Sequence, residues 1–242
     1  AGFVATDWEA GMPDGSMPAG VDNFMQPSAT SAVISSAEGV PDAILDAAVH
    51  RILVTKCEAG LFDWVEDDSM LADVGSTEHR EVARQAVRES LVLLQNNNSV
   101  LPLAKDSNVF VTGNGADDME RQWGGWTIFW QGSAGPITEG TTIEEAIGKH
   151  ANVVGSAGEA DVVVVVMAED PYAEFMGDES DIDTVDLSPL DAAAGKPTVA
   201  IVMSGRPVNI SARLEDADAW VAAWLPGTEG DGIADVLFGD YD

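Results

Sequence analysis

Residues 161–169 read DVVVVVMAE, and this stretch decides the fold of the chain. An unbroken run of β-branched residues of this length is typical of a strand that is buried on both faces of a sheet. The segment TVAIVMSG at residues 198–205 repeats the pattern. Two buried strands of this kind predict a mostly parallel sheet whose two faces are both covered.

The segments around these two runs alternate between strand and helix patterns. Strand-like apolar runs occur at 109–113, 151–155 and 218–226, and helical patterns occur at 140–150 and 230–239. Alternation of this kind predicts an α/β fold with a mostly parallel sheet that is covered on both faces.

The first part of the chain has a different character. Residues 2–6 predict a short strand that ends at Asp7, and residues 11–40, rich in Gly, Pro, Ser and Met, predict a loop with short helical pieces. Helices are predicted at 41–59, before a glycine stop, and from about 78 to 94. Because the sequence begins within a strand pattern, we expect a large N-terminal portion to precede it in the natural protein.

The composition excludes several classes of partner. The 242 residues include 42 acidic and 11 basic side chains, which gives a formal net charge of −31. A surface of this sign repels phosphate backbones and anionic lipids, so we expect neither nucleic acid nor a membrane as a partner. The chain has only four lysines (Lys56, Lys105, Lys149 and Lys196), which favours a salt-adapted or marine source. An acidic secreted protein is the alternative.

The single cysteine and the three histidines carry little chemistry. One cysteine, Cys57, cannot form an internal disulfide or a cysteine metal cluster, and we interpret it as a buried structural thiol within a helix. His50, His79 and His150 are isolated in the sequence, so neither a metal site nor a Ser-His-Asp triad can be assembled from them.

Three loops are placed to carry function, because functional groups collect at the carboxyl ends of parallel strands. These loops are residues 113–130, 169–178 and 204–207. The first begins GNGADD, which faintly resembles a phosphate-binding loop, but the third glycine is missing and acidic residues follow, which disfavours a nucleotide. It continues as RQWGGWTIFWQG, where three tryptophans in a glycine-rich loop suggest stacking on sugars; ordinary core packing is the alternative.

Two carboxylates stand out by position. Hydrolysis of a glycosidic bond with retention needs two carboxyl groups about 5–5.5 Å apart, one as nucleophile and one as proton donor. In so acidic a chain most carboxylates are surface charges, and composition alone selects none. Asp7 follows a strand end and precedes Trp8, and Glu174 lies in the loop EDPYAEFMGD between Tyr172 and Phe175.

Taken together, these segments resemble glycoside hydrolase family 3, the family of many β-glucosidases and exo-β-glucanases. The matching segments follow the family order and are GFVATDWEAG, AGVDNFM, AILDAAVHRILVTKCEAGLF, EHREVARQAVRESLVLLQNN, SVLPL, GADDMERQWGGWTIFWQG, GTTIEEAI, EDPYAEFMGD, SGRPV and VAAWLPGTEGDGIADVLFGD.

The resemblance implies a catalytic pair. The family's Ser/Thr-Asp-Trp motif falls on Asp7, which would be the nucleophile, and its Pro-Tyr-x-Glu motif falls on Glu174, the general acid/base. Asp7 must then stay ionised, and Glu174 must hold a proton near neutral pH. Neither step requires a metal or an organic cofactor.

The resemblance also implies how the substrate is held. Trp8 and Trp130 would clamp the second sugar unit, and Trp126 and Tyr172 of the same motifs are further candidate substrate-binding residues. This pattern favours exo-acting enzymes that act on β-linked glucosides and short β-glucans.

The family architecture is a (β/α)8 barrel followed by an α/β sandwich, with the active site between them. It implies that residues 1–62 are a C-terminal remnant of the barrel with the nucleophile. Residues 63–104 would be a connection and helix, and 105–242 the sandwich with the acid/base. We expect missing segments, because several stretches, such as that after Trp8, are shorter than usual. An extracellular or periplasmic location is implied by the resemblance alone, and the oligomeric state is not indicated.

Two alternatives remain open. The family's glucose-binding residues from earlier barrel strands do not occur in this sequence, so the chain could be a non-catalytic carbohydrate-binding fragment. Another specificity within the family, such as that of a β-xylosidase or a β-N-acetylglucosaminidase, is the second alternative.

Overall fold

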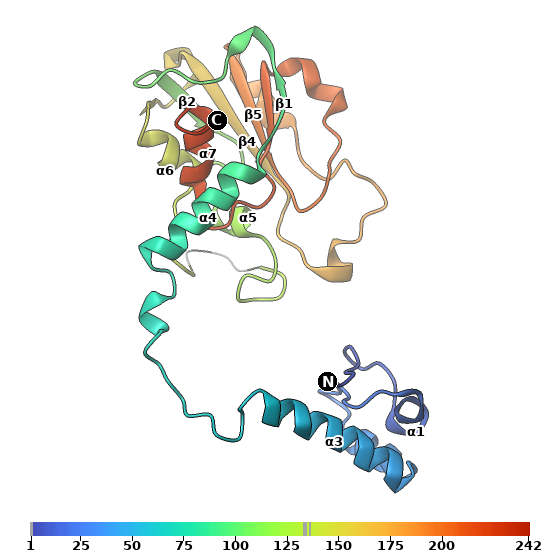
Figure 1. The fold of residues 1–242 in the computed structure, drawn as a ribbon. Coiled ribbons are helices and arrows are strands. Elements are labelled where there is room, and N and C mark those ends of the chain that lie inside the picture. Colours follow the sequence, from blue (N-terminus) through green and yellow to red (C-terminus); the bar gives the residue numbers. More distant parts are fainter. Residues whose placement is uncertain (1, 133–134, 136) are drawn as a thin grey trace. The chain divides into compact units, whose positions relative to one another are not determined.

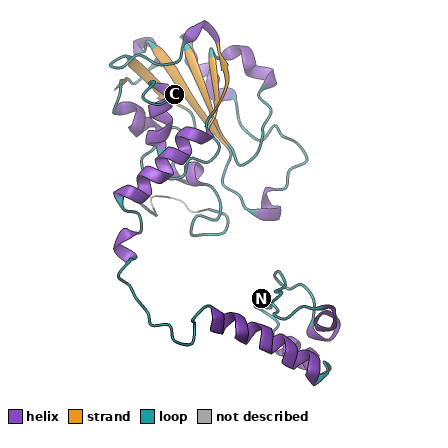
Figure 2. Ribbon diagram, viewed as in Figure 1, coloured by secondary structure: helices purple, strands orange, loops and turns teal. Residues whose placement is uncertain are grey.

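The computed structural model describes residues 2–132, 135 and 137–242. The chain forms two compact units, residues 1–70 and residues 71–242, and each is described here by itself. Figure 1 labels the main elements, and Figure 2 distinguishes helices from strands. Among the described residues, no helix is long and apolar enough to cross a membrane.

The described residues of the first unit form three α-helices, the 3₁₀ turn Met17–Ala19 and loops. The α-helices are α1 (Pro13–Ser16), α2 (Thr30–Ala37) and α3 (Asp42–Glu58). A small core forms where Met17, Val40 and Ala48 are buried together. The predicted helix at 41–59 is confirmed by α3, which begins after Pro41 and is followed by a left-handed glycine at position 60.

Three expectations for the first unit were wrong or only partly right. Residues 2–6 form an isolated bridge between Ala5 and Asn23 in place of a strand, because a single short neighbour offers too few hydrogen bonds for a regular ladder. Cys57 is exposed, because α3 packs into the core of this unit through Ile44, Leu45 and Ala48, more than two turns before Cys57. A (β/α)8 barrel does not occur among the described residues, which contain a single sheet, that of the second unit.

The second unit is built on a six-stranded sheet in the order β1-β6-β5-β4-β2-β3. Its strands are β1 (Val92–Asn96), β2 (Asn108–Thr112), β3 (Asn152–Val153), β4 (Val162–Ala168), β5 (Thr198–Met203) and β6 (Ala219–Ala222). Only β1 runs antiparallel to its neighbour, β6, and the other pairs are parallel. The α/β fold with a mostly parallel sheet is therefore confirmed for this unit.

The side chains of β4 separate into two cores, as the alternation of a strand requires. Val162, Val164 and Val166 pack with α4 (Thr77–Ser90), α6 (Ile143–Gly148) and α7 (Gly230–Leu237) on one face, where the ribbons lie together in Figure 1. Val163 and Val165 pack on the other face with the 3₁₀ turns at Ala157–Glu159 and Ser188–Ala193. α-Helices therefore cover one face, and short turns cover the other.

One predicted helix was too long. The helix expected from about 78 to 94 ends at Ser90, and Val92–Asn96 form the edge strand β1. Val92 lies opposite Ala222 in the antiparallel ladder with β6. Pairing with a strand that is distant in the sequence overrides the helical spacing of Val87, Leu91 and Leu94.

Candidate active site

The three loops at the carboxyl ends of β2, β4 and β5 meet, as the sequence predicts. Gly125, Glu169 and Gly205, one residue from each loop, line the same pocket. Glu169 is a nearly buried carboxylate directly after β4. Thr184 Oγ1 donates a hydrogen bond of 2.6 Å to Glu169, and the backbone N–H of Gly205 donates one of 3.1 Å. The Nε of Arg206 forms an ion pair with Glu169 at 3.0 Å. The buried charge is therefore neutralised, as a carboxylate out of water requires.

Tyr172 belongs to this network. Its hydroxyl group donates a 3.3 Å hydrogen bond to Glu169, and the guanidinium carbon of Arg206 lies 4.0 Å from its ring centre. Burial, and then the negative charge of Glu169, raise the pKa of the Tyr172 hydroxyl above its usual value. This predicted substrate-binding residue therefore supports the loop that precedes Glu174.

Glu174 begins the short 3₁₀ turn Glu174–Gly177 and is exposed in the second unit. Its φ is +51°, in the left-handed region that residues other than glycine rarely occupy. A pocket of about 250 Å³ lies beside it, and its lining includes Arg121, Asp170 and Leu225. Ala173, directly before Glu174, and Gly177, at the end of the turn, are buried, whereas the next residue, Phe175, is exposed.

The tryptophan loop, residues 121–132 (RQWGGWTIFWQG), has a buried part and an exposed part. Trp123 ends α5 (Met119–Trp123) and is buried, whereas Trp126 and Trp130 are 63% and 39% exposed. The ring centres of Trp126 and Trp130 lie 6.4 Å apart. The two rings are tilted by 49° to each other, and each offers an exposed apolar face, which suits the apolar face of a sugar.

Phe175 extends this surface and was not among the residues predicted from the sequence. Its ring lies 5.6 Å from that of Trp130 in an edge-on arrangement and is 64% exposed. Phe175 directly follows Glu174 in the chain, so the aromatic surface reaches the predicted acid/base. The only sequence signal for Phe175 was that an aromatic residue directly follows Glu174.

Asp7 and Trp8 lie in the first unit, and both are exposed there. The segment before them is tied to the loop at 22–25. The backbone N–H groups of Asp22 and Asn23 donate to the Val4 carbonyl at 2.9 and 3.1 Å. Asp22 in turn forms an ion pair with Arg51 of α3 at 2.6 Å. The hydrogen bond from Arg51 lowers the pKa of Asp22. These contacts hold the segment that precedes Asp7. Trp126, Trp130, Tyr172 and Glu174 belong to the second unit.

One cluster has the composition of a metal site. His150, Asp235 and Asp240 offer ligand atoms that lie within 4.8 Å of one another. Asp235, however, already pairs with Arg84 at 2.5 Å and with Arg88 at 2.6 Å, and Asp240 pairs with Lys105. These bonds occupy the carboxylates, so the cluster is an ion-pair network that ties α4 to α7.

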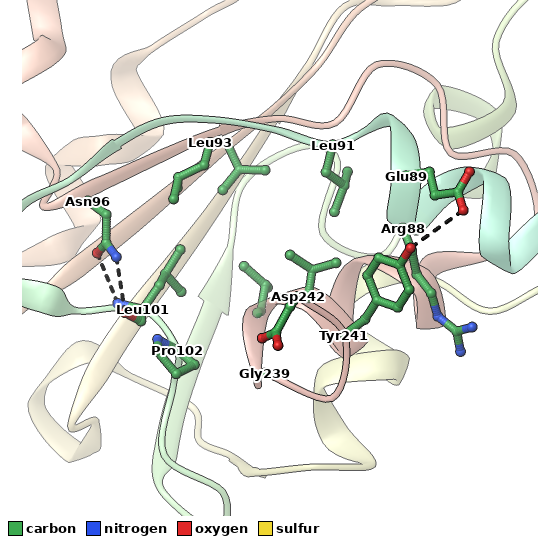
Figure 3. Close-up of a pocket in the computed structure, with 13 residues that line it drawn as sticks. Arg88, Glu89, Leu91, Leu93, Asn96, Leu101, Pro102, Gly239, Tyr241 and Asp242 are labelled. Carbon is green, nitrogen blue, oxygen red and sulfur yellow. Dashed lines mark hydrogen bonds between the residues drawn. The ribbon is translucent and has the colours of Figure 1, made fainter.

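A further groove, of about 600 Å³, lies beside the edge strand β1 (Figure 3). Its lining is mostly apolar and includes Leu91, Leu93 and Leu101. The side-chain amide of Asn96 exchanges two hydrogen bonds with the backbone of Leu101 at its rim. None of the predicted catalytic or substrate-binding residues lines this groove.

The chain resembles known proteins over nearly its whole length. It is 34% identical to the lysosomal beta glucosidase of Dictyostelium discoideum over 93% of this chain, and 31% identical to the periplasmic beta-glucosidase of Salmonella typhimurium over 82%. The solved exo-1,3/1,4-beta-glucanase from a Pseudoalteromonas species superimposes with a TM-score of 0.87 at 33% identity over 98% of this chain.

These relatives are much longer proteins. The chain spans about a third of the length of each: 33% and 32% of the two curated relatives and 34% of the solved chain. The match to the Dictyostelium protein runs over 270 positions, more than the 242 residues here, so that relative has residues within the matched region that this chain lacks. The family model described as the glycosyl hydrolase family 3 C-terminal domain matches residues 91–242, and the chain therefore belongs to glycoside hydrolase family 3.

Proposed function

We propose that the protein containing this chain is a retaining, exo-acting β-glucoside hydrolase that releases glucose from the non-reducing ends of short β-glucans. In this proposal Asp7 attacks the anomeric carbon, and Glu174 gives its proton to the departing sugar oxygen. Glu174 then takes a proton from the water that releases glucose from Asp7. Each step balances without a metal or an organic cofactor.

The observation that carries the proposal is the aromatic surface beside Glu174. Trp126, Trp130 and Phe175 form a continuous row with centre-to-centre spacings of 6.4 and 5.6 Å. Such a surface next to the proton donor suits a substrate of uncharged sugar units, and the net charge of −31 does not oppose a neutral substrate. The names of the related β-glucosidases and exo-glucanase support the same substrate class.

The proposal assigns a role to each part of the chain. Residues 1–62 would be the end of a barrel domain that carries the nucleophile, 63–104 the connection, and 105–242 the sandwich domain that carries the acid/base. Glucose would be held mainly by residues of the longer protein. The related periplasmic and lysosomal enzymes support a location outside the cytoplasm.

Removing the proposed proton donor tests this function. In the full-length protein, Glu174→Ala should abolish hydrolysis of laminaribiose. It should retain attack on 2,4-dinitrophenyl β-glucoside, whose leaving group needs no proton. Azide should then speed turnover of the aryl glucoside and yield β-glucosyl azide, because it replaces the water that Glu174 no longer activates. Full activity of Glu174→Ala on laminaribiose would exclude the assignment.

The same assay decides between sugars. If the xyloside or the N-acetylglucosaminide of the same leaving group were hydrolysed faster than the glucoside, the mechanism would stand and the substrate would change. A full-length protein that hydrolyses none of them would leave the non-catalytic carbohydrate-binding alternative.

A further inference from the structure

Gln131 holds the backbone of the residue that precedes Glu174. The N–H of Ala173 donates a hydrogen bond of 3.0 Å to Gln131 Oε1, and Gln131 Nε2 donates one of 3.1 Å to the Ala173 carbonyl. Both main-chain groups of Ala173 are thus satisfied by one side-chain amide. This pairing restrains the position and the rotation of the Ala173 peptide groups, as one rung of a β-ladder does.

This restraint acts directly before Glu174, whose backbone conformation is unfavourable without support from its surroundings. Glu174 has a φ of +51°, a conformation that persists only when the surrounding structure imposes it. On its other side, Arg206 Nη1 donates a 2.7 Å hydrogen bond to the carbonyl of Gly177, the last residue of the turn. Gln131 and Arg206 therefore fix the two ends of the segment that carries the proposed proton donor.

Gln131 also directly follows Trp130, so it joins two loops. The tryptophan loop lies against the 171–173 backbone so closely that a Cβ at Gly125 would lie 2.1 Å from the Tyr172 carbonyl oxygen. A Cβ at Gly132 would lie 2.7 Å from Pro171 Cβ. The tryptophan loop and the loop that carries Glu174, residues 169–178, are therefore in close contact, and Gln131 forms the hydrogen bonds between them.

We propose that Gln131 is a positioning residue for Glu174 and that it couples sugar binding on the tryptophan loop to proton donation. This inference rests on the proposed function, because it presupposes that Glu174 is the acid/base. Gln131 acts through the Ala173 peptide groups and takes no part in the chemistry itself.

Dependence on the leaving group separates this role from ordinary structural support. Departure of a sugar alkoxide needs a well-placed proton, whereas departure of 2,4-dinitrophenolate does not. A displaced Glu174 should therefore slow the first reaction and spare the second, since a misplacement of about 1 Å can cost about 100-fold in rate. Loss of general stability would reduce both reactions equally, through the amount of active enzyme.

The test compares Gln131→Ala with wild type in the full-length protein on laminaribiose and on 2,4-dinitrophenyl β-glucoside. We expect kcat/KM to fall about 10-fold to 100-fold on laminaribiose, mainly through kcat, and about threefold or less on the aryl glucoside. Gln131→Glu keeps the acceptor for the Ala173 N–H but loses the donor, and should fall between wild type and Gln131→Ala. It also covers the case in which Gln131→Ala does not fold.

Gln95 offers a matched control. Its side chain donates a 2.8 Å hydrogen bond to the Ala217 carbonyl, likewise from a glutamine to backbone, but in β1 and away from the loops. Gln95→Ala should affect both substrates by the same factor. Equal losses on both substrates in the Gln131 variants, or no loss in either, would overturn the positioning role.

The failure of this inference can be told from the failure of the proposed function. If Glu174→Ala shows azide rescue while Gln131→Ala loses both activities equally, only the role of Gln131 is refuted. If Glu174→Ala hydrolyses laminaribiose like wild type, the proposed function fails and the role of Gln131 fails with it.

Discussion

Arg206 lies over Tyr172, with its guanidinium carbon 4.0 Å from the ring centre, and its Nε is 3.0 Å from a carboxylate oxygen of Glu169. One side chain from the loop after β5 therefore neutralises the buried charge at the end of β4 and covers the tyrosine of the Glu174 loop. This contact joins two loops that are distant in sequence, residues 169–178 after β4 and residues 204–207 after β5.

Removal of Arg206 should destabilise the protein through Glu169. Arg206→Ala leaves a nearly buried carboxylate without its cation, and we expect the free energy of unfolding to fall by about 3 kcal/mol. Thermal unfolding followed by tryptophan fluorescence measures the change. Adding Glu169→Gln to Arg206→Ala should restore part of the loss, because no charge then remains to be neutralised. A loss in the single variant no larger than that of an exposed ion pair, below about 1 kcal/mol, would contradict this account.

The ion pairs of Asp235 should make stability dependent on acid. Burial opposes ionisation of Asp235, but hydrogen bonds from Arg84 and Arg88 outweigh it and lower its pKa below the usual 3.8. A carboxyl with a lowered folded-state pKa stabilises the fold above its unfolded-state pKa, and this stabilisation is lost as pH falls through the folded-state value. Asp235→Asn should thus cost about 3 kcal/mol near neutral pH and progressively less below pH 3.8. Urea unfolding at a series of pH values tests this.

Glu81 provides the control for Asp235. It pairs with the same Arg88, at 2.9 Å, but its side chain is 59% exposed. Glu81→Gln should cost less than about 1 kcal/mol. Similar losses for the two variants would show that burial of Asp235 does not decide the strength of its ion pairs.

The central sheet could be predicted from local sequence alone. Val162–Ala168 and Thr198–Met203 are so rich in β-branched residues that both expected strands formed within one or two residues of their predicted limits. Because parallel strands have their carboxyl ends at the same edge of a sheet, the proximity of the loops after β2, β4 and β5 could be predicted as well. Val92–Asn96 could not be predicted, because its strand depends on pairing with β6.

The residues of the site could be predicted from the sequence only where the residue type and its local sequence context are informative. Trp126 and Trp130 are conspicuous in a glycine-rich loop, but nothing local distinguishes them from Trp123, which is buried by packing. Gln131 has no motif of its own, and its role depends on a contact with Ala173 across 42 positions of sequence. The polar contacts that hold a loop in place are set by tertiary structure and leave no periodic pattern.

The aromatic surface should bind the second sugar of the substrate. Trp130→Ala and Phe175→Ala each remove one ring of the row, and we expect each to weaken binding of laminaribiose by about 1 kcal/mol, about fivefold in KM. Inhibition by glucose, which fills only the first sugar position, should stay the same. A parallel loss of glucose inhibition would place the rings at the first position instead.

Because the tryptophan loop packs closely against residues 171–173, alanine should be tolerated at some glycines of the chain and not at Gly125. Gly125→Ala puts a methyl group 2.1 Å from the Tyr172 carbonyl oxygen, so the loops must separate, and activity on laminaribiose should fall at least about 10-fold. Gly158→Ala meets only Ser156 Oγ, at 3.8 Å, and should be active. Steady-state kinetics of both full-length variants provide the comparison, and equal activities would contradict tight packing of the loops.

The assignment of Asp7 as nucleophile is tested most directly by trapping the covalent intermediate. The full-length protein is incubated with a 2-deoxy-2-fluoro-β-glucosyl inactivator, its intact mass is measured, and the labelled peptide is mapped. We predict a single glycosyl adduct on Asp7, within the peptide that contains GFVATDWEAG. An adduct on another carboxylate, or an active enzyme that forms no adduct, would contradict the central claim.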